Sequence, residues 1–181
     1  MRKSESGQTL IEFVVALGAA VAVLSAISGA VLHALNNAGF AKNQNLANQY
    51  SAQGMEIVRK IRTSSPMLFS TLGGSPSYYC LDGKQTTLSS PADLKDLNCK
   101  GCGKQGSSCS DTINRNIDNF FAREVDIESP ATDCTSSANL TKVTVNTSWI
   151  DSKCPSSPGN PFCHSVKLVS CMLKTQAIST P

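Results

Sequence analysis

The feature that most constrains the fold of this chain is an uninterrupted apolar run near the N-terminus. From Phe13 to Leu35, 23 residues include no Asp, Glu, Lys or Arg, and His33 is the only titratable side chain among them. A helix of about 20 apolar residues spans the hydrocarbon core of a bilayer. The run is longer than the apolar core of a secretory signal peptide, and no small-residue cleavage site follows it. The sequence therefore predicts a membrane-spanning helix.

The charges and cysteines that flank this run indicate its orientation. Arg2 and Lys3 precede it and favour a cytoplasmic N-terminus. All eight cysteines lie beyond residue 79, at Cys80, Cys99, Cys102, Cys109, Cys134, Cys154, Cys163 and Cys171. An even number confined to one part of a chain is typical of disulfides formed in an oxidising compartment. Both observations place the C-terminal part outside the cytoplasm. The formal net charge of +3 does not indicate a nucleic-acid-binding surface. Whether DNA is a partner stays an open question at this point.

A second helical pattern follows the apolar run. One side of residues 36–62 carries apolar residues at helical spacing, namely Leu46, Tyr50, Ile57, Val58 and Ile61. The other side carries Lys42, Asn43, Gln49, Gln53, Glu56 and Lys60. Pro66 cannot continue a helix. We therefore expect one helix over residues 8–62, apolar all round in 8–35 and amphipathic in 36–62, with the amphipathic half packed against a folded domain.

That domain, residues 63–181, has the alternating pattern of half-buried antiparallel strands. Three segments place apolar residues on one face: Phe121, Val125 and Ile127; Val143, Val145 and Trp149; and Val166, Leu168 and Met172. "SYYCLDG" favours a short strand and turn, and "SDTINRNIDNFF" favours a short helix. The expected fold class is α+β, with a long N-terminal helix packed on a small antiparallel sheet in a disulfide-rich head.

The stretch "GQTLIEFVVAL" resembles the prepilin processing motif of the type IV pilin and type II secretion pseudopilin superfamily. In that motif a glycine precedes the cut, and a glutamate is the fifth residue of the apolar helix that follows. The resemblance assigns Gly7 to the cut, Gln8 to the new N-terminus and Glu12 to the fifth position. It implies a leader of residues 1–7, N-methylation of Gln8, and pairing of Glu12 with a new N-terminal amine during assembly.

Within this superfamily the chain looks most like a minor pilin. Gln8 stands where many members have phenylalanine, and Gly29 stands where many major pilins have a helix-bending proline. The resemblance implies a subunit without enzymatic activity, cofactor, metal or small-molecule substrate. It also implies other pilin subunits, prepilin peptidase and an assembly platform as partners. The subunit would cross the inner membrane once with its head outside, and would be extracellular in a filament. A type II secretion pseudopilin, a membrane-anchored adhesive domain that does not polymerise and an anchored enzyme are the alternatives.

Several other motifs favour structural roles. Gly101–Gly106 matches a dinucleotide fingerprint but lacks the strand before it and the helix after it. Cys99, Cys102 and Cys109 could contribute to a zinc site, although disulfides are the simpler outcome outside the cell. We expect Cys154 to pair with Cys163 across a proline-rich loop, and Cys80 to pair within the Cys99–Cys109 group. A calcium site at Asp111, Asn114, Asn116 and Asp118 is disfavoured because the spacing is not that of a calcium-binding loop.

Overall fold

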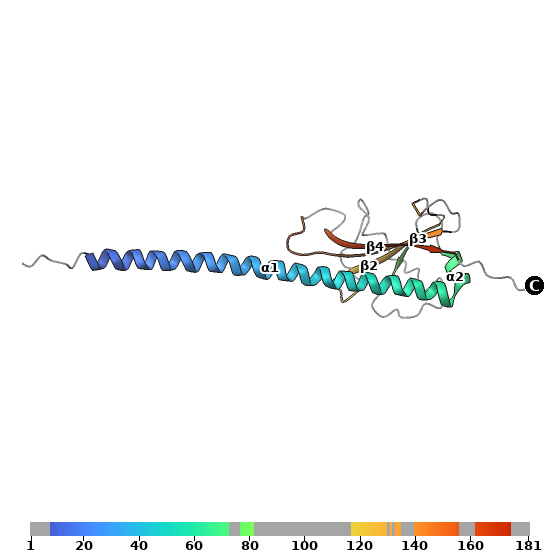
Figure 1. The fold of residues 1–181 in the computed structure, drawn as a ribbon, viewed down its shortest axis with the longest axis horizontal. Helices are drawn as coiled ribbons and strands as arrows, with labels where there is room; N and C mark the ends of the chain where they lie inside the picture. The colour runs from blue at the N-terminus through green and yellow to red at the C-terminus, as the bar shows by residue number, and fades with distance from the viewer. Residues whose placement is uncertain are drawn as a thin grey trace, which may run out of the picture. The chain divides into compact units, whose positions relative to one another are not determined.

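The computed structural model confirms the α+β class. It describes residues 8–72, 77–81, 117–129, 131, 133–134, 140–155 and 162–174. The elements are the helices α1 (Gln8–Ser64) and α2 (Pro66–Thr71) and the strands β1 (Ser77–Cys80), β2 (Ala122–Glu128), β3 (Leu140–Trp149) and β4 (His164–Leu173) (Figure 1). The chain divides into two compact units, Met1–Asn43 and Gln44–Pro181. The second unit, called the head below, contains the last part of α1 and the whole sheet.

Helix α1 ends where the sequence predicts, within two residues. Its last residue is Ser64, and Pro66 lies in the first turn of α2, where its missing N–H costs nothing. The Ser64 hydroxyl donates to the Lys60 carbonyl at 2.8 Å, and the Ser65 amide donates to the Ile61 carbonyl at 2.8 Å. The second bond satisfies one of the last four carbonyls of the helix, which have no intrahelical partner.

The sheet is an antiparallel meander in the order β1-β2-β3-β4. Its register aligns the predicted inward positions, since Val125 pairs with Val145 and Val145 pairs with Leu168. Val125, Val143 and Val145 are fully buried, as the alternation predicts. On the opposite face of β3, Asn146 is also buried and only 7% exposed.

The Gln44–Ser64 part of α1 packs on one face of this sheet. The predicted apolar residues Ile57, Val58 and Ile61 are buried in the core. Three small residues, Ala47, Ser51 and Gly54, are also buried on this part of the helix. A Cβ at Gly54 would lie only 2.9 Å from Cγ1 of Val145, so the absence of a side chain there allows the helix to approach the sheet closely.

The predicted short helix of "SDTINRNIDNFF" is wrong where the structure describes it. Ile117 and Phe121 form a bridge in which each backbone amide donates to the carbonyl of the other at 3.0 Å. Between them Asp118 and Asn119 have φ values of 51° and 53°. Two consecutive left-handed residues cannot belong to a right-handed helix, and Asp and Asn tolerate that conformation better than other residues with a side chain. The earlier residues of this segment lie outside the described ones.

Candidate functional site

The N-terminal unit exposes a continuous apolar surface on α1. The large apolar side chains from Leu10 to Leu35 are half or more exposed, with Leu10 at 67%, Phe13 at 69% and Leu35 at 64%. Helix α1 is long and apolar enough to cross a membrane. A signal sequence near an N-terminus meets the same criteria of length and composition. Apolar surface of this extent marks a site that a membrane or other helices cover.

Two serines in this surface are already hydrogen-bonded within α1. The Ser25 hydroxyl donates to the Val21 carbonyl, and the Ser28 hydroxyl donates to the Leu24 carbonyl, each at 2.9 Å. A hydroxyl that bonds back to its own helix needs no water or partner helix. These serines therefore do not interrupt the apolar character of the helix.

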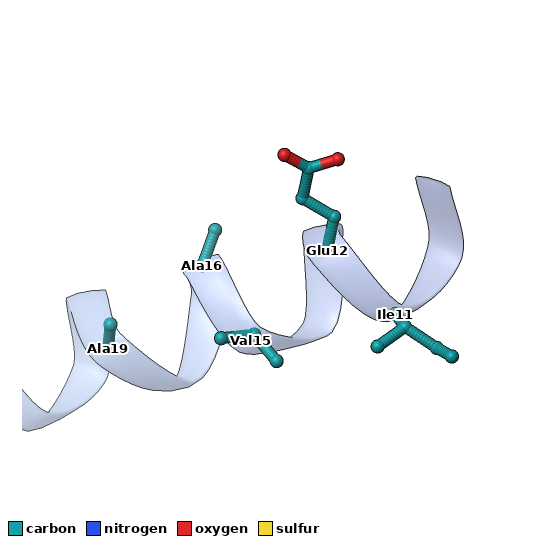
Figure 2. A pocket seen from close by; sticks show the side chains of 5 residues that line it. All are labelled: Ile11, Glu12, Val15, Ala16 and Ala19. Atoms are coloured by element: carbon teal, nitrogen blue, oxygen red, sulfur yellow. The ribbon is translucent and has the colours of Figure 1, made fainter. Parts of the chain in front are cut away.

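Glu12 is the one acidic residue in this surface (Figure 2). Its side chain extends away from α1 on the same side as Ala16, while Ile11 lies on the opposite side (Figure 2). Glu12, Ala16 and Ala19 have the spacing of one helix face, and two small side chains therefore follow the carboxylate along that face. No residue in the described parts of the chain forms a hydrogen bond or ion pair with Glu12. The acid and its small neighbours would admit a second helix at close range.

The structure places the processing residues only in part. Gly7, with the rest of the leader, lies outside the described residues, whereas Gln8 is the first residue of α1. Four residues of helix rise about 6 Å, so Glu12 lies one turn from the backbone nitrogen of Gln8. The predicted roles of Gly7, Gln8 and Glu12 stay predictions.

A buried arginine, which the sequence analysis missed, joins the helix to the sheet. Arg123 is 0% exposed. Its Nη1 donates to the Tyr50 carbonyl and to Oε1 of Gln53, and its Nε donates to the Leu81 carbonyl, each at 3.0 Å. Burial of a guanidinium is tolerated because its N–H groups find acceptors. The sequence does contain a signal for this burial, since the alternation of Phe121, Val125 and Ile127 also places position 123 on the inward face.

Side-chain bonds from α1 add to this connection. The Ser51 hydroxyl lies 2.8 Å from Oγ1 of Thr147 and 3.4 Å from the Val166 carbonyl. The Tyr50 hydroxyl donates to Oδ2 of Asp118 at 2.9 Å. This hydrogen bond, together with burial, raises the pKa of Tyr50 above its ordinary value. Bonds of this kind fix which turn of α1 lies over which strand, because sliding the helix would leave buried groups unpaired.

Two disulfides join described residues of the head. The predicted pair Cys154–Cys163 is confirmed, with Cα atoms 5.4 Å apart. Cys134 pairs with Cys171 at a Cα–Cα distance of 5.9 Å, a bridge that the sequence did not single out. Cys99, Cys102, Cys109 and the side chain of Cys80 lie outside the described residues, as do Gly101–Gly106 and the residues Asp111, Asn114 and Asn116.

Comparison of the chain with family models, with curated proteins and with solved structures finds no match. The class of protein therefore rests on the chain itself. It is an α+β protein in which an apolar helix, long enough to span a membrane, continues into a disulfide-bonded head.

Proposed function

We propose that the chain is a minor type IV pilin subunit, cut by prepilin peptidase after Gly7 and assembled into, or priming, a pilus-like filament. The observation that carries the proposal is the lone acid Glu12 in an otherwise uncharged, exposed apolar surface on α1. A helix that only anchors a protein in a membrane needs no acid at this position. In a subunit that must leave the bilayer and join a bundle of helices, an acid can pair with a charged group of a neighbouring subunit.

The chemistry of the cut explains how that acid would act. Cleavage after Gly7 creates an amine at Gln8, and an α-amino group has an ordinary pKa of about 7.7–8.0 and is largely protonated at neutral pH. Burying a carboxylate at the centre of a membrane helix costs roughly 2.5–3.5 kcal/mol on insertion scales. Pairing with a cation offsets much of that cost. The carboxylate of Glu12 would therefore favour a position beside the N-terminal amine of a neighbouring subunit.

The remaining parts of the molecule suit the same role. Ala16 and Ala19 would let a neighbouring helix approach the carboxylate closely, since small residues allow tight packing of helices in a membrane. The Arg123 contacts would keep the head attached to α1 while the apolar part changes from a lipid to a protein environment. Before assembly the subunit would cross the inner membrane once, with its head on the oxidising side.

The cut itself gives the test of this proposal. In cells that contain prepilin peptidase, intact mass and N-terminal sequencing of the extracted protein should show Gln8 as the first residue, with the added mass of a methyl group. Gly7→Leu should stay uncut, because the resemblance implies that a bulky residue blocks the cut. Gly18→Ala is the matched control, since a Cβ there meets no atom within 4 Å, and it should be cut normally. A wild-type chain that keeps Met1 in such cells would contradict the proposal.

A type II secretion pseudopilin is the second candidate. Helix α1 runs unbroken through Gly29, where a proline is common in major pilins, and this favours either a minor pilin or a pseudopilin. The two differ in where the assembled subunit is found. A minor pilin should appear in fibres sheared from the cell surface, whereas a pseudopilin should stay in the cell envelope.

A further inference from the structure

The Cys154–Cys163 disulfide lies among side chains that commonly bind metal ions. Asp151 and Cys154 follow strand β3, Cys163 directly precedes β4, and His164 is the first residue of β4. The two pairs meet because Trp149 at the end of β3 is the register partner of His164. One ligand atom from each of these four residues lies within 4.8 Å of the other three.

Neighbouring groups hold two of these side chains in place. The Lys153 amide donates to Oδ1 of Asp151 at 2.8 Å, which leaves Oδ2 facing Nε2 of His164 at 3.1 Å. The His164 ring stacks on Trp149 with ring centroids 5.3 Å apart and an angle of 28° between the planes. Fixed orientation of ligands by a second layer of contacts is a property of metal sites.

A backbone amide also faces one of the two sulfurs. The Asp151 amide points at Sγ of Cys154 at 3.4 Å, a contact that would stabilise a thiolate on this cysteine.

We propose that reduction of the Cys154–Cys163 disulfide creates a four-coordinate site for a zinc-type divalent cation, with Asp151 and His164 as the other two ligands. A dithiol reductant supplies two electrons and two protons, so the S–S bond breaks, two thiols form and the reductant becomes a disulfide. The cation then displaces the two thiol protons into solvent. Two thiolates, an imidazole and a carboxylate are ligand types that zinc accepts. The proposal does not depend on the chain being a pilin.

The geometry requires little movement. Zinc bonds of about 2.0–2.3 Å in a tetrahedron place ligand atoms about 3.3–3.8 Å apart. The facing atoms of Asp151 and His164 are already 3.1 Å apart. The two sulfurs would have to separate by about 1.7 Å from a disulfide bond length of about 2.05 Å. Rotation of the cysteine side chains supplies this separation, and the exposed side chain of Cys163 is accessible to a reductant. Disulfide and metal would thus be two alternative cross-links of the same β3–β4 connection.

The test is zinc protection of individual cysteines in the full chain in detergent micelles. The protein is reduced with dithiothreitol, freed of reductant without oxygen, incubated with or without Zn²⁺, and alkylated, and each cysteine is then read by peptide mass spectrometry. We expect Zn²⁺ to protect Cys154 and Cys163 from alkylation. His164→Gln should abolish this protection and weaken zinc binding at least about tenfold. His33→Gln, which changes the other histidine, should leave the protection unchanged.

A second pair of variants separates this site from other thiols of the reduced chain. Replacing both Cys154 and Cys163 by Ser should remove one equivalent of bound zinc, whereas replacing both Cys134 and Cys171 should leave the protection of Cys154 and Cys163 intact. Equal alkylation of Cys154 and Cys163 with and without Zn²⁺ would overturn the proposal. Equal protection in wild type and His164→Gln would overturn it as well.

Discussion

Replacement of Gly54 by alanine would place a methyl group where α1 lies closest to the sheet. An ideal Cβ at this position is 2.9 Å from Cγ1 of Val145 and 3.2 Å from Cδ of Arg123. Real Cβ atoms essentially never come within 3.0 Å of a heavy atom outside their own and the adjoining residues, so a neighbour must move. Neither neighbour moves freely, because Val145 is fully buried and Arg123 is held by three hydrogen bonds.

Two opposing terms set the size of the effect. Overpacking a core costs about 1–3 kcal/mol. Exchanging glycine for alanine inside a helix gains about 1 kcal/mol. The expected result for Gly54→Ala is therefore a loss of up to about 2 kcal/mol in the free energy of unfolding of the head.

Urea unfolding of the full chain in detergent measures this loss. The only tryptophan of the chain, Trp149, is 1% exposed inside the head, so its fluorescence follows the unfolding of the head. Gly39→Ala is the matched control, because a Cβ there meets nothing within 4 Å, and it should cost no stability.

A double variant tests whether the clash is the cause. In the Gly54→Ala background, Val145→Ala removes the nearest atom, so the two substitutions should couple favourably by about 1 kcal/mol or more. If Gly54→Ala stabilises the head as a simple gain in helix propensity would, then α1 does not lie this close to β3 and the described packing is wrong.

Two further predictions concern cross-links and pH. The residues of the Cys134–Cys171 bridge are 37 apart in sequence, and those of the Cys154–Cys163 bridge are 9 apart. Loop entropy then predicts that replacing each pair by serine lowers the free energy of unfolding by about 4 and about 2.5 kcal/mol, respectively. A larger fall in the urea midpoint for the Cys154–Cys163 replacement would contradict this order. Because the pKa of Tyr50 is raised in the folded state, its contribution to stability is complete below its unfolded value of about 10 and is lost as the pH rises through the folded pKa. Asp118→Asn removes the main cause, so the ultraviolet titration of Tyr50 should move to lower pH, and an unchanged titration would show that the Tyr50–Asp118 bond is absent.

The fold was largely predictable because its signals are local. Alternation identified the inward residues of β3, such as Val143, Val145 and Trp149, and a proline marked the end of α1. The Cys154–Cys163 bridge was predictable because the two cysteines enclose one short loop. The Cys134–Cys171 bridge was not, because its partners are far apart in sequence and eight cysteines allow many pairings.

Polar or very small residues at the contact between helix and sheet were not predictable from apolar periodicity. Arg123, Ser51 and Gly54 all lie at this contact. Their burial depends on partners that come together only in the folded head, such as the Tyr50 carbonyl for Arg123. The candidate site on α1, by contrast, was predictable from the sequence. Glu12 was found at once because a lone charge in an apolar run is visible without any tertiary contact.

The most direct test of the central claim is incorporation of a Glu12 variant into filaments. The quantity measured is the amount of this subunit in sheared fibres relative to membranes, for wild type, Glu12→Ala and Glu12→Asp. Membrane insertion, the cut after Gly7 and folding of the head should be the same in all three. We predict that Glu12→Ala fails to enter fibres because no acid meets the amine of Gln8, and that Glu12→Asp enters partially because it keeps the charge on a shorter side chain. Equal incorporation of Glu12→Ala and wild type would contradict the claim that this carboxylate drives assembly.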